Sequence, residues 1–426
     1  MGEDRDRSAA RRYFLTVLVV IFAALSMVAL FNIVIDPYAV WRLVSIPGVN
    51  AVKPSETLWG RMAKAETVRR LKPQAIILGS SRAMFSLDPQ RPGWRDGRTP
   101  LYNLALPRSR MAELRAYFDL AVRVAPVKVA MLELEFYSGN ANLQPVNEYD
   151  DARMGALGWS RDLPHLLFGD ALGLSLQTIW LNQRAMRGER VLITRRLDGK
   201  RDFLYPENFD SQATEAGDEQ GYLSQWLTPD PGSSFCLRND KTGSDPLREL
   251  DGLLRTAESK SVKVIVVVGP VYGRRLEMIR QAGLWPVYEQ WKRSVVRIAA
   301  AHRGSAGGSG PVVWDFTRFN ALTTERFYPA HDPRGPSRYF WDSVHYKDVV
   351  GNMILDAVSS DAATAGQAPN GNGMTVTPAN VDAQLESERR GLDQFEHEQP
   401  DAVREIAGFL LALRARQGRE RLCSLT

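Results

Sequence analysis

The sequence predicts a three-layer α/β/α protein, in which a parallel sheet lies between helices, with a transmembrane helix at the N-terminus. Continuous apolar runs alternate with amphipathic segments, which is the pattern of a parallel sheet covered on both faces. A chain of 426 residues with 44% hydrophobic content can bury a sizeable core. A loop-rich stretch at about residues 140–243 interrupts the alternation, so we expect an insertion over the sheet, as a lid or substrate platform.

The first element is an uncharged run of 23 residues, Tyr13–Ile35, which is long enough to cross a bilayer as a helix. A cleaved signal peptide has a shorter apolar stretch and a small-residue cleavage site, so we expect an uncleaved anchor. A buried core helix is the alternative, but the run is apolar on every face. Basic residues precede it at Arg5, Arg7, Arg11 and Arg12.

The positive-inside rule predicts the orientation of this anchor. Residues 1–12 form a cytoplasmic tail, residues 13–35 span the membrane, and the rest of the chain faces the periplasm. We therefore expect a single-pass protein of a bacterial inner membrane.

The elements after the anchor follow from short apolar runs for strands and from apolar residues at helical spacing for helices. Residues 36–360 form the α/β domain. Residues 361–426 form a C-terminal helical extension, because the low-complexity loop Ala362–Gly373 precedes two amphipathic helices. The expected strands are Gln74–Leu78, Pro100–Leu106, Lys128–Phe136, Lys263–Val268 and Pro311–Asp315. The expected helices are Glu56–Leu71, Arg110–Val124, Leu172–Met186, Asp245–Ser259, Trp285–Ala301, Lys347–Ser359, Asn380–Glu396 and Ala402–Gln417.

Charge and cysteine content limit the possible partners. The net charge of +5 is spread along the chain without a basic block, so nothing indicates a nucleic-acid partner. Cys236 and Cys423 permit one disulfide in an oxidising compartment, or both can remain free thiols.

A serine at a strand end is the first candidate for chemistry. Ser81 follows the apolar run 75–78 and Gly79, at the edge of a parallel sheet where ligands bind. A serine needs a base within hydrogen-bond reach to act as a nucleophile. Among the five histidines, His345 is the best base, because Asp342 precedes it by three residues and can orient its imidazole. A capping aspartate beside a surface histidine is the structural alternative.

Charged residues near this serine have two interpretations each. Arg82 is either a surface residue at the entry to a helix or an anion-binding group beside the nucleophile. Glu133 and Glu135 end an apolar strand, and alternation sends both away from Leu134. They either point into the crevice or form an ion pair with a neighbouring arginine, and we favour the ion pair.

The order of a strand-end serine near the front and Asp-x-x-His near the C-terminus resembles the SGNH/GDSL hydrolases, which have a flavodoxin-like sheet. More narrowly, it resembles the membrane-anchored SGNH-like proteins of cell-envelope and exopolysaccharide O-acylation systems. The order of the segments carries the resemblance more than any single one. The matching segments are Ile77–Arg82, Tyr102–Pro107, Leu134–Tyr137, Val268–Pro270, Trp314–Phe316 and Trp341–Tyr346.

The resemblance implies roles for individual residues. Ser81 matches the nucleophile, His345 the general base and Asp342 its orienter. It also implies an oxyanion hole made by the backbone N–H of Ser81, a glycine and an asparagine. Here the chain departs from the pattern: the second segment has no glycine, and Glu135 stands in the third segment. Asn103 is then the candidate side-chain donor, with Arg82 and Glu135 as further substrate-binding candidates.

Two functions follow as expectations. The first is a serine esterase or O-acyltransferase that acts on an acyl group of an envelope or secreted polysaccharide. Its partners would be a glycan and a membrane-bound O-acyltransferase, and it needs no cofactor or metal. The second is a catalytically degraded SGNH-like protein that binds glycan or acts as a scaffold in a polysaccharide complex. A weaker third reading is a metal-dependent hydrolase with ligands His331, Asp332, Asp342 and His345.

Overall fold

The computed structural model describes most of the chain, and its backbone forms two compact units. Unit 1 comprises residues 1–70 and 150–197, and unit 2 comprises residues 71–149 and 198–426. The residues described are 2–54, 60–146, 149–189, 194–202, 210–227, 235–302, 310–329, 332–359, 367–368 and 371–417. The sequence-based prediction treated 36–360 as one domain with one insertion, whereas the structure divides that insertion between the two units.

Unit 1 begins with the N-terminal helix α1 (Gly2–Ile35), which is mostly exposed and is long and apolar enough to cross a membrane. The end of α1 packs against α5 and α6, where the Asn32 carboxamide donates to the Leu167 carbonyl at 2.7 Å. This packing explains why residues 150–197 belong to this unit. Its other elements are β1 (Lys53–Pro54), α2 (Gly60–Leu71), η2 (Asp151–Met154), α5 (Gly158–Leu167), α6 (Asp170–Met186) and β5 (Thr194–Arg195).

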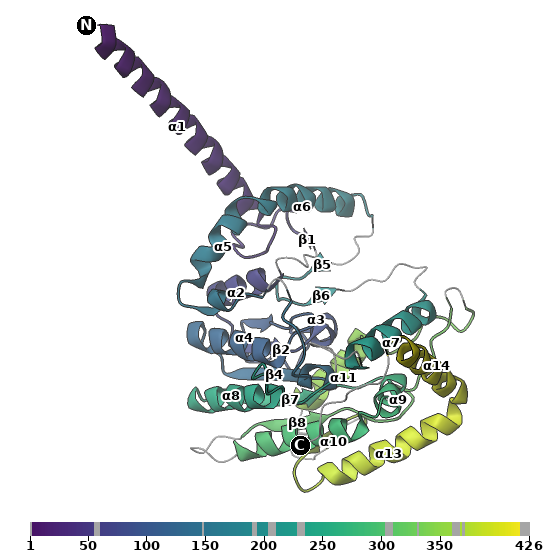
Figure 1. The fold of residues 1–426 in the computed structure, drawn as a ribbon. Helices are drawn as coiled ribbons and strands as arrows, with labels where there is room; N and C mark the ends of the chain where they lie inside the picture. The colour runs from purple at the N-terminus through teal and green to yellow at the C-terminus, as the bar shows by residue number, and fades with distance from the viewer. Residues whose placement is uncertain are drawn as a thin grey trace. The chain divides into compact units, whose positions relative to one another are not determined.

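Unit 2 contains a six-stranded sheet in the order β3-β2-β4-β7-β8-β9. Figure 1 labels the four central strands β2, β4, β7 and β8. The first five strands are parallel, and β9 pairs antiparallel with β8. Numbered along the chain, the parallel strands have the order 2-1-3-4-5, which is that of flavodoxin-like sheets. The expected mixed α/β fold with a mostly parallel sheet is therefore confirmed. The strands are β2 (Ala75–Leu78), β3 (Leu101–Asn103), β4 (Val129–Leu134), β7 (Lys263–Val268), β8 (Val312–Asp315) and β9 (Met374–Val376), and a separate short strand is β6 (Arg201–Asp202).

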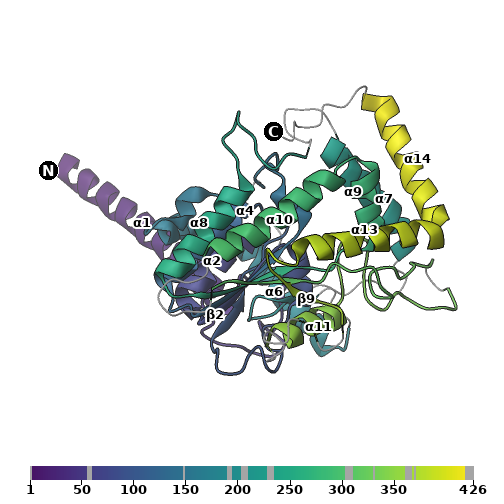
Figure 2. The ribbon, with the colours of Figure 1, turned by 90° about the horizontal axis from the view of Figure 1, so that it is seen from below.

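Helices cover both faces of this sheet. Figure 2 shows α4, α8 and α10 on one side and α11 on the other, and α4 and α10 each contact α8. Alternate side chains such as Ile77, Met131 and Val267 share a buried cluster with residues of α3 and α11. The helical elements are α3 (Ser81–Ser86), α4 (Met111–Val124), η1 (Phe136–Gly139), α7 (Ser211–Leu227), α8 (Pro246–Ser259), α9 (Gly273–Gln281), α10 (Trp285–Ala301), α11 (Asp348–Ser359), α13 (Val381–Glu398) and α14 (Pro400–Gln417).

The two C-terminal helices pack onto unit 2. Ile406 and Leu410 of α14 are buried, and α14 contacts α7 and α9. From α10, the buried Lys292 Nζ donates to Glu388 of α13 at 2.6 Å and to Asp315 of β8 at 2.8 Å. The two amphipathic helices expected at the C-terminus are thus present, and both pack onto the rest of unit 2. Cys423, one of the two residues of the possible disulfide, lies outside the described residues.

Candidate active site

The chain turns sharply between β2 and the serine. Gly79 has φ +154°, and a Cβ built there would lie 2.8 Å from the Cβ of Ala83 and 3.1 Å from the Glu133 carbonyl oxygen. Only glycine fits this exit from the strand. Ser80 then caps α3, because its hydroxyl accepts a hydrogen bond from the Arg82 backbone N–H at 3.3 Å. Ser81 is therefore the first residue of α3, at the carboxyl end of β2.

This position is the topological switch point of the sheet. β2 pairs with β3 on one side and with β4 on the other, and the next helices run over opposite faces. In doubly wound sheets a crevice opens at this point, beyond the carboxyl ends of the strands. The fold thus places a serine hydroxyl where parallel sheets usually bind ligands.

Ser81, His345 and Asp342 form one hydrogen-bonded chain. The Ser81 Oγ lies 2.9 Å from His345 Nε2, and His345 Nδ1 lies 2.8 Å from Asp342 Oδ2. A carboxylate can only accept a hydrogen bond, so His345 Nδ1 carries the ring proton and donates to Asp342. Nε2 then has no proton and can accept the one from the serine hydroxyl. The imidazole is partly open to solvent, with 19% of the side chain exposed, whereas only 5% of Asp342 is exposed. This is the geometry of a serine nucleophile with its base and orienting carboxylate.

The aspartate and histidine lie on a tight turn that precedes helix α11. A bridge between Phe340 and Tyr346 closes this turn, and α11 begins only at Asp348. Within it, Asp342 Oδ1 accepts the backbone N–H groups of Val344 and His345, both at 2.7 Å. An aspartate readily makes this local turn, which competes with helix formation.

Two contacts from α3 hold the turn that carries His345. Phe85 of α3 lies edge-on to the His345 imidazole, with ring centroids 5.2 Å apart. The Ser86 hydroxyl donates to the Tyr346 carbonyl, which ties α3 to the same turn. Nucleophile and base are therefore fixed relative to each other by one short helix.

Arg82 is buried beneath the site and fits neither interpretation drawn from the sequence. Its Nε lies 3.6 Å from Glu133 Oε1, its Nη1 lies 3.7 Å from Glu135 Oε2, and its Nη2 donates to the Pro270 carbonyl. Only 3% of Arg82 is exposed. Burial raises the pKa of Glu133 to about 7, although the positive charge of Arg82 acts in the opposite direction. The ion pair favoured for the two glutamates is present.

Asn103 does not reach toward an oxyanion. Its amide nitrogen donates to the carbonyls of Ala83 at 2.9 Å and Leu87 at 3.0 Å, and its Oδ1 accepts from the Ala105 N–H at 3.1 Å. Both N–H groups of the carboxamide are thus committed to holding α3. The expectation that Asn103 supplies an oxyanion donor is wrong for this geometry.

The backbone N–H groups of residues 103–106, in the second matching segment, also donate to other groups. The N–H groups of Asn103, Leu104 and Leu106 donate to the carbonyls of Asp198, Ile77 and Gly79, respectively. The N–H of Ser81 has no partner within its own helix, because it is the first residue of α3. Among the groups proposed for the oxyanion hole, only this N–H is positioned at the nucleophile.

Sequence reasoning missed Asp218, which α7 brings to the site. Burial raises the pKa of Asp218 to about 6, the negative charge of Asp342 raises it further, and the positive form of His345 lowers it. On the same helix, Tyr222 lies under the guanidinium of Arg275, 3.7 Å from its ring centroid. Helix α7 lies in the expected insertion, but nothing in its composition marked Asp218.

The proposed metal ligands do not gather around one point. Asp332 binds Arg334 through two hydrogen bonds of 2.7 Å, while Asp342 and His345 bind each other. His331 lies outside the described residues. The donors that can be placed are therefore engaged in separate contacts, and the metal-dependent reading is not supported.

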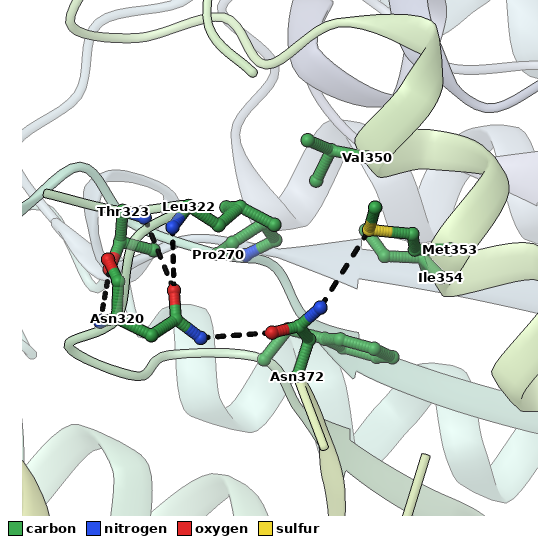
Figure 3. Close-up of a pocket in the computed structure, with 9 residues that line it drawn as sticks. Pro270, Asn320, Leu322, Thr323, Val350, Met353, Ile354 and Asn372 are labelled. Atoms are coloured by element: carbon green, nitrogen blue, oxygen red, sulfur yellow. Dashed lines mark hydrogen bonds between the residues drawn. The ribbon is translucent and has the colours of Figure 1, made fainter. Parts of the chain in front are cut away.

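A small void lies behind the active-site turn and does not resemble a substrate site. It measures about 10 Å³, which is room for about one water molecule. Figure 3 shows the hydrogen bond from Asn320 to Asn372 at its wall, together with the apolar side chains of Val350 and Ile354. We interpret this void as an imperfection of packing between α11 and the 320–323 loop.

Comparison with known proteins adds no identification: no protein-family model, curated protein or solved structure matches this chain.

Proposed function

We propose that this chain is a membrane-anchored serine esterase or O-acyltransferase of the SGNH/GDSL type. Its substrate would be an acyl group carried by an envelope or secreted polysaccharide. The hydrogen-bonded chain from Ser81 through His345 to Asp342 carries this proposal. Its position at the switch point of a 2-1-3-4-5 sheet supports the same class of fold.

The geometry supports a two-step acyl transfer. In the first step His345 Nε2 takes the Ser81 proton, Oγ bonds to the acyl carbon, and the departing sugar oxygen receives that proton. In the second step a water or sugar hydroxyl gives its proton to Nε2 and attacks the acyl-serine. The bond to Oγ then breaks and Ser81 recovers its proton. Asp342 holds the imidazole and stabilises its charged form throughout.

The compartment is part of the proposal. Helix α1 would anchor the chain in a bacterial inner membrane, and Arg5, Arg7, Arg11 and Arg12 before it would keep the N-terminus in the cytoplasm. The triad would then face the periplasm, where envelope and exported glycans are found. A membrane-bound O-acyltransferase is the corresponding partner, as the supplier of acyl groups.

A second function is favoured by one observation, the shortage of oxyanion donors. The backbone N–H groups of residues 103–106 all bind elsewhere, and loss of one such donor typically costs on the order of a hundredfold in rate. A protein that binds glycan without turnover would tolerate that loss. The alternative is therefore a degraded SGNH-like glycan-binding or scaffold protein.

Hydrolysis of p-nitrophenyl acetate by the full chain in detergent separates the two. We expect slow turnover by the wild type, a loss of roughly a thousandfold or more in Ser81→Ala, and no change in Ser259→Ala, which alters an exposed hydroxyl on α8. Equal rates for Ser81→Ala and wild type would disprove the assignment of the nucleophile. Absence of turnover in a folded wild type would favour the binding protein.

A further inference from the structure

A second cavity, of about 430 Å³, lies in unit 2 and does not include Ser81, Asp342 or His345 among its lining residues. It is bordered by α7, by α9, by α14 and by the segment that follows Glu325. Its volume is in the range of small-molecule sites. Most of the side chains that line it are polar, charged or aromatic, so an apolar ligand would not fit it.

The charges in this cavity are closely balanced. Arg274 donates to both carboxylate oxygens of Glu219 at 2.7 Å and to Glu405 at 3.0 Å. Elsewhere in the lining, Arg334 makes two hydrogen bonds of 2.7 Å to Asp332. Each of these guanidinium groups is thus already neutralised by carboxylates. An anionic ligand would meet those carboxylates. The third arginine of the lining is the exposed Arg326, which donates to the Glu398 carbonyl at 3.2 Å.

Glu215 is a buried carboxyl in the lining of the cavity, and one of its two oxygens has no hydrogen-bond partner among the described residues. Its exposed fraction is 7%, and its Oε1 has no hydrogen-bond partner within the described part of the chain. The nearest cation is Arg274 Nε, at 3.4 Å. Burial raises the pKa of Glu215 to about 8, so at neutral pH this carboxyl carries a proton that it can donate. The carboxyl also interacts with the Tyr272 side chain. Buried polar atoms are normally paired, so a ligand hydroxyl at Oε1 would complete the hydrogen bonding of this carboxyl.

Aromatic residues complete the cavity. Tyr272 and Phe327, both in its lining, stack with ring centroids 4.9 Å apart. Tyr328 is half-buried, and the Arg334 guanidinium lies 3.6 Å from its ring centroid. The walls therefore combine flat apolar surfaces with paired donors and acceptors.

We propose that this cavity binds a neutral, hydroxyl-rich ligand, namely an uncharged sugar unit of a glycan. Each sugar hydroxyl both donates and accepts, which suits walls made of carboxylate–guanidinium pairs. Its C–H faces can pack on tyrosine, as apolar groups do on aromatic rings. The choice of a glycan rests on the proposed function, whereas the preference for a neutral polyol rests on the cavity itself.

Two segments connect this cavity to the candidate active site. Helix α7 presents Glu215 to the cavity, and its Asp218 interacts electrostatically with Asp342 and His345. The Glu325 carboxylate, just before the cavity residues Phe327 and Tyr328, accepts backbone N–H groups at 338–340, shortly before Asp342. A sugar bound in this cavity would be one unit of a glycan. Another unit of the same glycan would carry the acyl group that reaches Ser81.

The test is binding of the full chain in detergent to an array of neutral and anionic oligosaccharides. We expect the wild type to retain neutral oligosaccharides, and Tyr328→Ala and Arg334→Ala each to weaken binding about tenfold or more. Arg238→Ala, which removes another exposed arginine with an aspartate partner, is the matched control and should bind as the wild type does. Glu215→Leu tests the buried carboxyl, with thermal unfolding to check that the variant folds.

Several results would overturn this proposal. It is refuted if the wild type binds no oligosaccharide or prefers anionic sugars. It is also refuted if Tyr328→Ala and Arg334→Ala both bind as tightly as the wild type. Fluorophosphonate labelling of the wild type is measured in parallel. If Ser81 is labelled but no sugar binds, only the cavity proposal fails. If sugars bind through Tyr328 and Ser81 is unreactive, only the proposed acyl chemistry fails.

Discussion

One imidazole ring connects the two ends of the candidate site. Asp342 accepts three N–H groups, from the Val344 backbone, the His345 backbone and His345 Nδ1. These contacts hold the turn and set the proton on Nδ1 at the same time. A side chain with only one acceptor oxygen cannot make all three.

Asp342→Asn should therefore reduce the reactivity of Ser81 far more than it reduces stability. An asparagine directed at the backbone leaves its NH₂ facing Nδ1, which favours the wrong tautomer. By analogy with such substitutions in other triads we expect a loss of about 10³–10⁴ in ester hydrolysis. Asp382→Asn, at an exposed position on α13, is the control. A variant whose rate of ester hydrolysis lies within tenfold of the wild-type rate would show that Asp342 has no part in the chemistry.

Gly269 gives the buried ion pair its room. A Cβ at this position would lie 2.4 Å from Glu133 Oε1 and 3.0 Å from Arg82 Nη2. We expect Gly269→Ala to lower the free energy of unfolding by about 1–3 kcal/mol, because neither buried group has space to move. Gly408→Ala, within α14 and with no atom within 4 Å of the new Cβ, should be stabilising by up to about 1 kcal/mol. Equal effects in denaturant titrations would contradict this account of the cluster.

At the scale of elements, the sequence predicted what is uniformly buried and failed where tertiary contacts decide. The bounds of β7 and α10 are as expected, because an apolar run and a clear helical period each leave one solution. Helix α7 was not predicted because its sequence has few apolar residues. Strand β9 was not predicted because three residues are too few to show an alternating pattern.

The residues of the candidate site also divide into those that the sequence predicted and those that it did not. Ser81, Asp342 and His345 could be found because local motifs mark them. The burial of Arg82, the commitment of Asn103 to α3 and the approach of Asp218 depend on packing between distant segments. No local pattern encodes them.

Helix α7 also makes the stability depend on pH. In the folded chain, burial raises the pKa of Glu215 from 4.5 to about 8 and that of Asp218 from 3.8 to about 6. A raised folded-state pKa means that the folded chain holds the proton more tightly than the unfolded chain. The resulting stability is complete below the unfolded pKa and is lost as the pH rises through the folded pKa.

Glu215→Gln should therefore lose less stability than the wild type as the pH rises from 5 to 9. Melting temperatures measured across this range should fall less in the variant than in the wild type. Glu386→Gln, half-exposed on α13, should leave the wild-type slope unchanged. A slope in Glu215→Gln as steep as that of the wild type would contradict the assigned titration.

At the scale of the whole molecule, the apolar helix α1 continues into the folded part of unit 1. Asn32 and Asp36 are buried, and the Ser175 hydroxyl donates to Asn32 Oδ1 at 2.8 Å. Asp36 in turn accepts the Val40 N–H at 2.8 Å. The last residues of the helix and those just after it are therefore part of unit 1.

Two truncations test this overlap. A variant that lacks residues 2–28 should become soluble and keep its melting temperature, because it retains Asn32 and Asp36. A variant that lacks residues 2–39 should unfold at a lower temperature, since it loses these buried residues. The measurements are membrane fractionation and thermal unfolding. Membrane retention of the shorter deletion, or equal melting temperatures, would contradict the account.

The most direct test of the central claim is fluorophosphonate labelling of the full chain in detergent, followed by peptide mapping of the modified residue. We predict one adduct on Ser81 in the wild type and in Ser259→Ala. It should be absent from Ser81→Ala and strongly reduced in His345→Ala. An adduct on another residue, or labelling of Ser81→Ala as strong as that of the wild type, would contradict the claim that Ser81 is an activated nucleophile.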